Sequence, residues 1–484
     1  MFGFRRKSNR TQERWTAMRE LETAGLLPDE GEPGGIVLGE WRDPKGGKRI
    51  LRHRGPDHVL VIAPCRSGKT TGITIPTLLS WDESVLVFDV KGESYEVTRN
   101  FRERRLGQRV LRFEPGAPNS ARFNPLSEIR LDRNLVRDAA QICGMLMNPA
   151  QDEHENHWTR CACHLLTAIT LYVRLSQSPD GLPDGGSLAT VRAILTDGGP
   201  LRGVRPVRDA AAAEDCTART MLAYIREVAD DWVSRAVRSG RLAPSDKEHE
   251  ARLAGWQAVA EILEHWSAAG NAEFGSVIAT AKHALTIFAD PAVAANTSES
   301  DFSIDSLVAG SEKVSLYITA SPLSYPRHQA LSKLLVDMVI RRRLEALGAN
   351  GSKSRLLLLI DDIGVFGRLP VLVNEGLAGF SACAVTGLFV TQSRAQISKT
   401  FWETEAGSIV GNCAIQVAYA PNTLETATFF GARSALSVEE IMRTPEDEAL
   451  FFVPGCPPFR CGKVEYYRDE PFRTRANGDS GKLR

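Results

Sequence analysis

Residues 63–71 carry the residue types that grip a nucleoside triphosphate. They read Ala63-Pro64-Cys65-Arg66-Ser67-Gly68-Lys69-Thr70-Thr71 and follow an apolar run, Val59–Ile62. Glycine lets the backbone approach phosphate oxygens, successive N–H groups form an anion nest, and the helix expected next presents its positive end. Strand, turn, Gly-Lys-Thr and helix is the order that a phosphate-binding loop requires. We therefore predict that all nine residues bind nucleotide, with Ala63 in the place of the usual first glycine.

Two side chains of this loop have distinct expected roles. Lys69 would reach the β- and γ-phosphates, and Thr70 would place its hydroxyl on Mg²⁺, because a hard cation prefers oxygen ligands. Arg66 would add positive charge near the phosphates. The alternative is an ordinary strand-to-helix turn that contains Gly-Lys-Thr by chance.

An acidic pair, Asp361 and Asp362, directly follows the apolar run of residues 356–360. Such a run is typical of a strand buried on both faces. Asp361 would hold Mg²⁺ through water, and Asp362 would orient or deprotonate the attacking water. The alternative is a core strand that ends in two turn-forming aspartates.

Composition indicates a soluble globular protein with room for two or three domains. The chain has 484 residues, of which 43% are hydrophobic and 24% charged, and its formal net charge is zero, so any contact with DNA must be local. Nine cysteines without paired spacing favour a reducing cytoplasm. No uncharged apolar run reaches the roughly 18 residues of a membrane-spanning helix, so we expect none in this chain.

Short apolar or β-branched runs recur along the chain with helical stretches between most of them, which is typical of a parallel α/β sheet. The predicted strands are 59–63, 84–89, 109–113, 314–319, 356–361, 386–391, 413–418 and 449–453. This rhythm stops between residues 126 and 276, where long Ala-, Leu- and Arg-rich segments predict an inserted all-α domain. We thus expect a helix and linker in 1–34, a discontinuous nucleotide-binding domain in 35–125 and 277–470, and a disordered tail in 471–484.

Several further motifs give the chain a family resemblance that runs from about residue 35 to 472. They are Gly35-Ile36-Val37-Leu38-Gly39, Pro76-Thr77-Leu78-Leu79-Ser80-Trp81, Phe88-Asp89-Val90-Lys91-Gly92-Glu93, Phe123-Asn124-Pro125-Leu126, Gly367-Arg368-Leu369, Thr391-Gln392-Ser393, Asn412-Cys413 and Tyr419-Ala420-Pro421-Asn422. Together with the loop and the acidic pair, in this order, they resemble the TraG/TraD family, the DNA-pumping ATPases that serve as coupling proteins of type IV secretion and conjugation systems.

The resemblance implies a RecA-like P-loop NTPase fold: a mostly parallel twisted sheet, interrupted by an all-α domain, that uses ATP and Mg²⁺. It also implies a ring-shaped homo-hexamer that handles single- or double-stranded DNA and delivers DNA, or a relaxase–DNA complex or another secreted substrate, to components of a type IV secretion channel. The place implied is the cytoplasm, at the inner face of the inner membrane, reached through partners. Gln392 is similar to the family's sensor glutamine and would act in catalysis with Lys69 and Asp362; alternatively it is a polar strand end.

The chain also departs from the family pattern. Asp362 stands where the family usually has glutamate, so hydrolysis is expected to be slower. Members of the family normally begin with two transmembrane helices, whereas we expect none in this sequence, which would put direct membrane anchoring in doubt. No position matches an arginine finger well, although Arg368 and Arg394 lie close in sequence to the acidic pair and Gln392; structural arginines are the alternative. Arg341, Arg342 and Arg343 end a predicted helix and are candidates for DNA contact.

Two rival functions use the same residues. One is an adaptor that binds nucleotide as a switch and recruits cargo without pumping DNA, which the missing anchor and Asp362 both motivate. The other is a coupling protein for protein effectors. Neither is separated from DNA translocation by the sequence alone.

Overall fold

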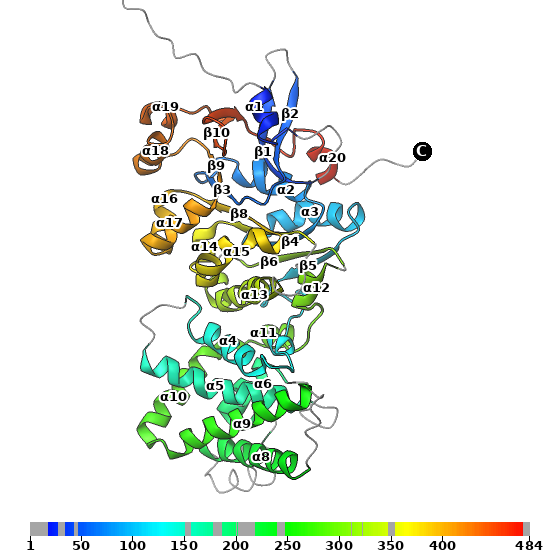
Figure 1. Cartoon of the computed structure of the whole chain (residues 1–484), viewed down its shortest axis with the longest axis vertical. Helices are drawn as coiled ribbons and strands as arrows, with labels where there is room; N and C mark the ends of the chain where they lie inside the picture. Colours follow the sequence, from blue (N-terminus) through cyan, green and yellow to red (C-terminus); the bar gives the residue numbers. More distant parts are fainter. Residues whose placement is uncertain are drawn as a thin grey trace, which may run out of the picture.

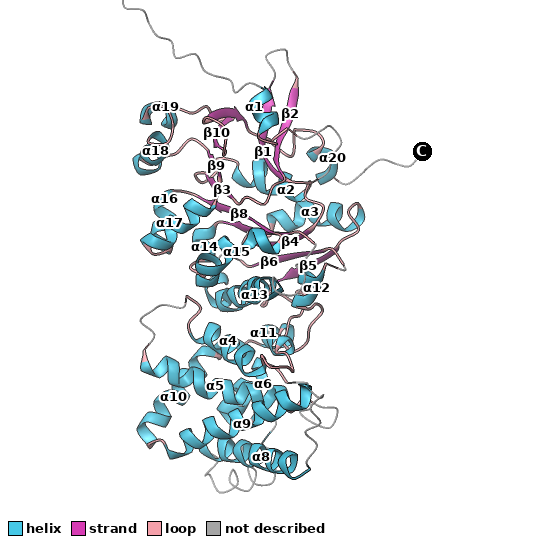
Figure 2. Cartoon of the chain, in the orientation of Figure 1, coloured by secondary structure: helices cyan, strands magenta, loops and turns pink. Residues whose placement is uncertain are grey.

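The computed structural model describes residues 18–27, 34–42, 47–150, 156–177, 186–199, 201, 218–239, 247–310, 312–321, 323–346 and 354–477. The molecule is elongated, with a sheet and its covering helices at one end and a stack of helices at the other (Figure 1). Figure 2 shows that all the strands lie in the first part and that the second part is helical.

One sheet of eleven strands runs through the first part in the order β2-β1-β11-β10-β9-β3-β8-β7-β4-β6-β5. The strands are β1 (Ile36–Arg42), β2 (Lys48–His53), β3 (Val59–Ile62), β4 (Ser84–Asp89), β5 (Arg109–Phe113), β6 (Val314–Thr319), β7 (Leu356–Asp361), β8 (Val385–Thr391), β9 (Ile415–Ala418), β10 (Glu448–Phe452) and β11 (Phe459–Gly462). From β9 to β5 all neighbours are parallel, whereas β10, β11, β1 and β2 pair antiparallel at the other end. The predicted mostly parallel sheet is confirmed.

The central strands are buried on both faces because their alternate side chains enter two different cores. In β7, Leu356, Leu358 and Ile360 belong to one apolar cluster, while Leu357 and Leu359 belong to another. Side chains in a strand alternate between faces, so a run without polar residues suits a sheet that is covered on both sides.

Helices cover the sheet and form the second part. They are α1 (Met18–Thr23), α2 (Ile75–Leu78), α3 (Glu93–Arg104), α4 (Leu135–Met147), α5 (His157–Leu175), α6 (Leu188–Asp197), α8 (Ala218–Ser239), α9 (Lys247–Ala268), α10 (Asn271–Ala284), α11 (Pro291–Asn296), α12 (Ile304–Ala309), α13 (Tyr325–Glu345), α14 (Ile363–Phe366), α15 (Leu377–Gly379), α16 (Arg394–Thr400), α17 (Glu403–Asn412), α18 (Leu424–Gly431), α19 (Val438–Met442) and α20 (Phe472–Ala476). Helix α13 lies between the sheet and the helical part, where α4 packs against it (Figure 1).

The sequence predicts an all-α insert in residues 126–276. Among the described residues, β5 and β6 enclose only helices, as expected for an all-α insertion. The expected boundary at 276, however, falls inside α10, a continuous helix that packs against α5. We propose that the insert ends after α10, near Leu285.

Three other expectations need correction or fall partly outside the described residues. The sequence missed β1, β2 and β11, which together with β10 form the antiparallel end of the sheet. The tail expected to be disordered from 471 contains α20, whose Phe472 is fully buried against α2 and β1 residues; 478–484 lie outside the described residues. The N-terminal helix expected within residues 1–34 is described only as Met18–Thr23. No helix in the described part is both long and apolar enough to cross a membrane.

Candidate nucleotide-binding site

The predicted site residues meet at one edge of the sheet. Strand β8 lies between β3 and β7, and all three run parallel, so their carboxyl ends point the same way. The phosphate loop follows β3, the acidic pair ends β7, and Gln392 follows β8. Ligands of parallel α/β sheets bind beyond this edge.

The phosphate loop has the backbone shape that its sequence predicts. Gly68 takes a φ of +86°, and Arg66 takes a φ of +61°, a left-handed conformation that few non-glycine residues adopt. Ser67 donates its hydroxyl to the Pro64 carbonyl at 2.7 Å, which closes the turn. Ala63, directly after β3, is fully buried. A short π-type helical turn, η1 (Thr70–Thr74), then leads into α2.

Thr70 and Asp361 lie next to each other although 291 positions separate them. The Thr70 hydroxyl donates to Asp361 Oδ2 at 3.0 Å, and the other carboxylate oxygen, Oδ1, is buried without a hydrogen-bond partner. Burial raises the pKa of Asp361 to about 6, against the opposing effects of the Thr70 hydroxyl and Lys69. A hydroxyl, a carboxylate and a spare buried oxygen beside an anion-binding loop fit Mg²⁺, which prefers such ligands and keeps several waters.

Asp362 faces the same space from the start of α14. It has a φ of +82°, and its Oδ2 lies 4.0 Å from Lys69 Nζ. The Gln392 side chain donates its Nε2 hydrogen to this same oxygen at 2.7 Å, while its Oε1 accepts from the Cys65 thiol at 3.1 Å. The structure thus brings together Lys69, Asp362 and Gln392, the three residues for which the sequence predicts a catalytic role.

No sequence motif points to Gln396, which contacts the other oxygen of Asp362. Its Nε2 donates to Asp362 Oδ1 at 2.8 Å, and its Oε1 accepts from the backbone N–H of Gln392 at 2.9 Å and from the Thr391 hydroxyl at 2.8 Å. The spacing of the two glutamines could have indicated this contact. Ser393 caps α16, so the side chain of Gln396, four positions after Gln392, lies on the same side of the helix as Gln392.

A C-terminal segment also reaches the phosphate loop without a sequence signal. Lys463 Nζ donates to the Ser67 carbonyl at 3.3 Å and lies 3.9 Å from the centre of the Tyr419 ring. Burial lowers the pKa of Lys463 to about 8. The backbone N–H of Tyr466 bonds to the Thr71 carbonyl, and Gly72 leaves space for Tyr419 and Val464.

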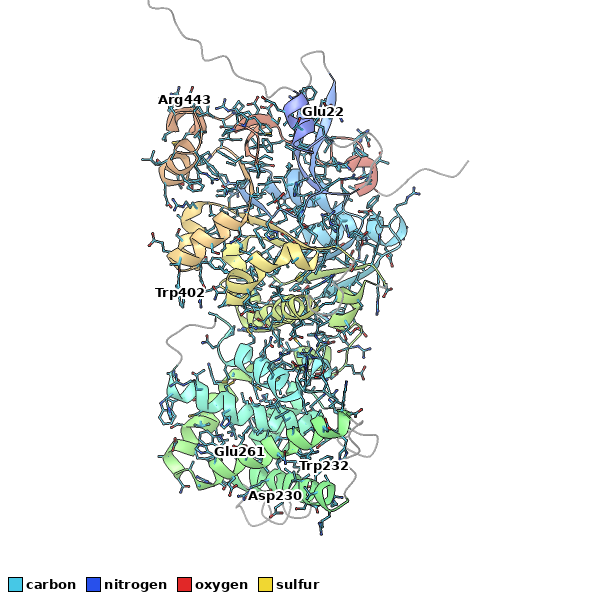
Figure 3. The ribbon with its side chains drawn as sticks, viewed as in Figure 1. Glu22, Asp230, Trp232, Glu261, Trp402 and Arg443 are labelled. Atoms are coloured by element: carbon cyan, nitrogen blue, oxygen red, sulfur yellow. The ribbon has the colours of Figure 1, made fainter. Side chains whose placement is uncertain are left out.

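The two candidate arginine fingers have different surroundings. Arg368 forms a buried, two-pronged ion pair with Glu405 (2.8 and 2.9 Å), and its guanidinium lies 3.6 Å from the ring centre of Trp402, which Figure 3 labels beside α17. It is therefore a structural residue. Arg394 lies 4.8 Å from the Phe429 ring and lines a cavity of about 580 Å³ between α16, α17 and α18.

The three arginines proposed for DNA contact all have partners within the protein. Arg343 is fully buried and donates to the Leu307 carbonyl at 2.6 Å. Arg341 and Arg342 pair with Asp337 and Asp305, at 3.0 and 3.1 Å. The end of α13 is thus an anchor for the surrounding loops, because each guanidinium already has a partner.

Comparison with known proteins places these motifs in one family. The profile of the family described as Type IV secretory system Conjugative DNA transfer matches residues 14–434. Conjugal transfer protein TraG of Escherichia coli is 32% identical over 437 residues, which cover 86% of this chain and 62% of TraG. Protein VirD4 of Rhizobium rhizogenes is 25% identical over 520 residues, which cover 100% of this chain and 69% of VirD4. The chain therefore spans less than two thirds of the length of TraG.

Solved structures give the same fold at lower identity. The plasmid coupling protein TrwB in complex with the non-hydrolysable ATP analogue ADPNP has a TM-score of 0.56 and 14% identity, with 92% of each chain covered. TrwB in complex with ADP and Mg²⁺ has a TM-score of 0.54 and 15% identity, with 93% of this chain and 99% of TrwB covered. The predicted RecA-like fold with a helical domain is thereby confirmed.

Proposed function

This chain belongs to the family of type IV secretory system conjugative DNA transfer proteins, and we propose that it is an ATP-driven coupling protein that delivers DNA, or a relaxase–DNA complex, to a secretion channel. The observation that carries the proposal is the joining of the phosphate loop to a distant acidic pair, with Thr70 bonded to Asp361 at 3.0 Å. The family's name and the relatives TraG and VirD4 support DNA transfer over an adaptor that does not pump.

In this proposal ATP is the substrate and Mg²⁺ is the cofactor, which supplies charge neutralisation between the phosphates. Complexes of TrwB with ADPNP and with ADP and Mg²⁺ support both choices. The backbone of residues 63–71 cradles the phosphates, and Lys69 reaches the β- and γ-phosphates. Thr70 and Asp361 hold the cation. Catalysis of phosphoryl transfer depends mainly on positioning and charge stabilisation, which these residues supply.

Asp362 orients the attacking water and accepts its proton at a carboxylate oxygen. Gln392 donates a hydrogen bond to that carboxylate and follows β8 directly. Loss of the γ-phosphate can therefore shift Gln392 and, through it, α16. We place the molecule in a homo-hexameric ring at the cytoplasmic face of the inner membrane, held there by channel components, with the helical insert recognising the relaxase or another substrate.

The proposal is tested with purified full chain, Mg·ATP and single- or double-stranded DNA. We expect DNA-stimulated hydrolysis that Lys69→Ala abolishes, because the β- and γ-phosphates lose their cation. Lys313→Ala is the matched control, since Lys313 pairs with Glu83 at 3.1 Å beside the first residue of β6, away from the site. Tight binding of ATP without turnover, with or without DNA, would instead identify the adaptor.

A further inference from the structure

The carboxylate of Asp362 is held at both of its oxygens by side-chain amides. Gln392 donates to Oδ2 at 2.7 Å, and Gln396 donates to Oδ1 at 2.8 Å. Hydrogen bonds to an ionised acceptor are stronger than those between neutral groups, and two of them from opposite ends leave the carboxylate little freedom to rotate.

The orientation of the Gln396 amide is fixed by its other contacts. Its Oε1 accepts from two donors, the Thr391 hydroxyl and the Gln392 N–H, so its NH₂ end must face Asp362. Gln396 therefore joins the acidic residue to the strand end that carries Gln392. Neither donor of this pair can shift without affecting the other, because the Gln392 backbone is bonded to Gln396.

A glycine on α14 leaves the room that the Gln396 side chain occupies. A Cβ atom at Gly364 would lie 2.4 Å from the Cγ, Cδ and Nε2 atoms of Gln396, far inside any real contact. Gly364 follows Asp362 by two residues, so the same short helix that presents the carboxylate also admits its second amide.

The backbone at Asp362 explains why a short acid stands there. Its φ of +82° and ψ of 75° lie in the left-handed region, which Asp and Asn tolerate better than longer side chains do. A glutamate would also carry its carboxylate past the two amides. The short aspartate side chain and the two amides thus act together. Hydrogen bonds, rather than the length of the side chain, set the position of the carboxylate.

We propose that Gln396 is a positioning residue for hydrolysis, which together with Gln392 holds the Asp362 carboxylate toward the attacking water, in space that Gly364 keeps open. The inference rests on the proposed ATPase function. It predicts that Gln396 affects the rate of the chemical step and leaves the binding of nucleotide unchanged, because Gln396 contacts the acid and no residue of the phosphate loop.

The test compares three variants of the full chain by the kcat of DNA-stimulated hydrolysis and by the Kd for Mg·ATP from calorimetry. Gln396→Glu keeps the size and the acceptor oxygen but removes the donor, so kcat falls about 10- to 100-fold while Kd stays within about twofold. Gly364→Ala displaces the Gln396 side chain and lowers kcat similarly. Lys399→Ala, exposed on the same helix, is the control and leaves both quantities unchanged.

Double variants separate positioning from a general structural effect. In the Gln396→Ala background, the space is empty, and Gly364→Ala causes no further loss of kcat. In the Asp362→Asn background, Gln396→Glu causes no further loss either, since the group it positions is gone. A kcat within twofold of the wild type for both Gln396→Glu and Gly364→Ala overturns the inference. If Asp362→Asn is equally neutral, the proposed role of Asp362 in hydrolysis fails; absence of Mg·ATP hydrolysis by the wild type would overturn the proposed ATPase function itself.

Discussion

The carboxyl edge of the sheet and the helical insert differ in the kind of side chain that they bury. At the edge, polar side chains from positions about 300 residues apart share hydrogen bonds, and a carboxylate oxygen of Asp361 is buried with no partner. In the insert, Trp266, Val259 and their neighbours form an apolar core, in which the buried Trp266 Nε1 lacks a hydrogen-bond partner but is uncharged, and exposed ion pairs such as Arg235 with Asp231 stay within one helix. The edge is therefore built for function at a cost in stability, whereas the insert is built for stability.

The largest effect is expected from a substitution at the carboxyl edge of the sheet. We expect Asp361→Asn to lower hydrolysis at least about 10³-fold, because the cation loses its carboxylate, and yet to raise stability by about 1–3 kcal/mol at pH 7.5. The reason is the pKa of Asp361, which burial raises from 3.8 to about 6 in the folded state. The folded protein therefore holds the proton more tightly, and wild-type stability falls as the pH rises from about 4 to about 6.

Thermal unfolding without nucleotide measures the stability difference between Asp361→Asn and the wild type. The gain from Asp361→Asn is complete above about pH 7 and disappears below about pH 3, where the wild-type carboxyl is protonated in both the folded and the unfolded state. Ser354→Ala, outside the edge at the start of the segment leading to β7, serves as the control. If the stability difference between Asp361→Asn and the wild type were equal at high and at low pH, it would not arise from burial of the ionised carboxylate.

The next largest effect is expected from a substitution in the core of the insert. Trp266→Ala removes a large side chain that is 1% exposed in the core between the helices of the insert, and we expect it to lower the free energy of unfolding by about 3–5 kcal/mol. The affinity of the folded protein for Mg·ATP should stay the same, because the insert shares no residue with the phosphate loop. Val237→Ala, at a residue that is 62% exposed on α8, is the control. Weaker nucleotide binding in Trp266→Ala would show that the two regions are coupled.

The smallest effect concerns the surface of the insert, where Asp230 and Trp232 of α8 are labelled in Figure 3. Arg235 and Asp231 are one turn apart at 2.6 Å, and both side chains are more than half exposed. We expect Arg235→Ala to change stability by about 0.5 kcal/mol or less, and less still in high salt. Denaturant unfolding at two salt concentrations checks this; a change above about 1 kcal/mol would mean that the surface contributes more than the comparison allows.

Much of the nucleotide edge could be predicted because its signals are local. Five apolar residues before Asp361 mark a buried strand, and glycine with lysine marks the loop, whatever the rest of the chain does. Strand β2, Lys48–His53, gave no such signal because three of its six residues are basic and its first three are not fully buried. Strand β11 has only four residues, and its place is set by pairing with β10 and β1 rather than by its own sequence.

The missed site residues depend on contacts between distant segments. A glutamine at 396 is an ordinary helix residue until α14 and β8 bring Asp362 to it, and Lys463 reaches Ser67 from the far end of the chain. Phe472 is a lone aromatic residue in a polar tail, and only the pocket formed by Val37, Ile75 and Leu79 makes it part of a core. Local patterns carry no information about such partners.

The strand order has a consequence for synthesis on the ribosome. Strand β3 carries the phosphate loop, but its two neighbours are β8 and β9, which lie about 300 residues later in the chain. At about 5–20 residues per second, translation takes roughly 15 to 60 s to produce them. Throughout that time both edges of an apolar strand lack their partners, which is the condition that invites aggregation. The nascent chain should therefore depend on chaperones most strongly before its last quarter emerges.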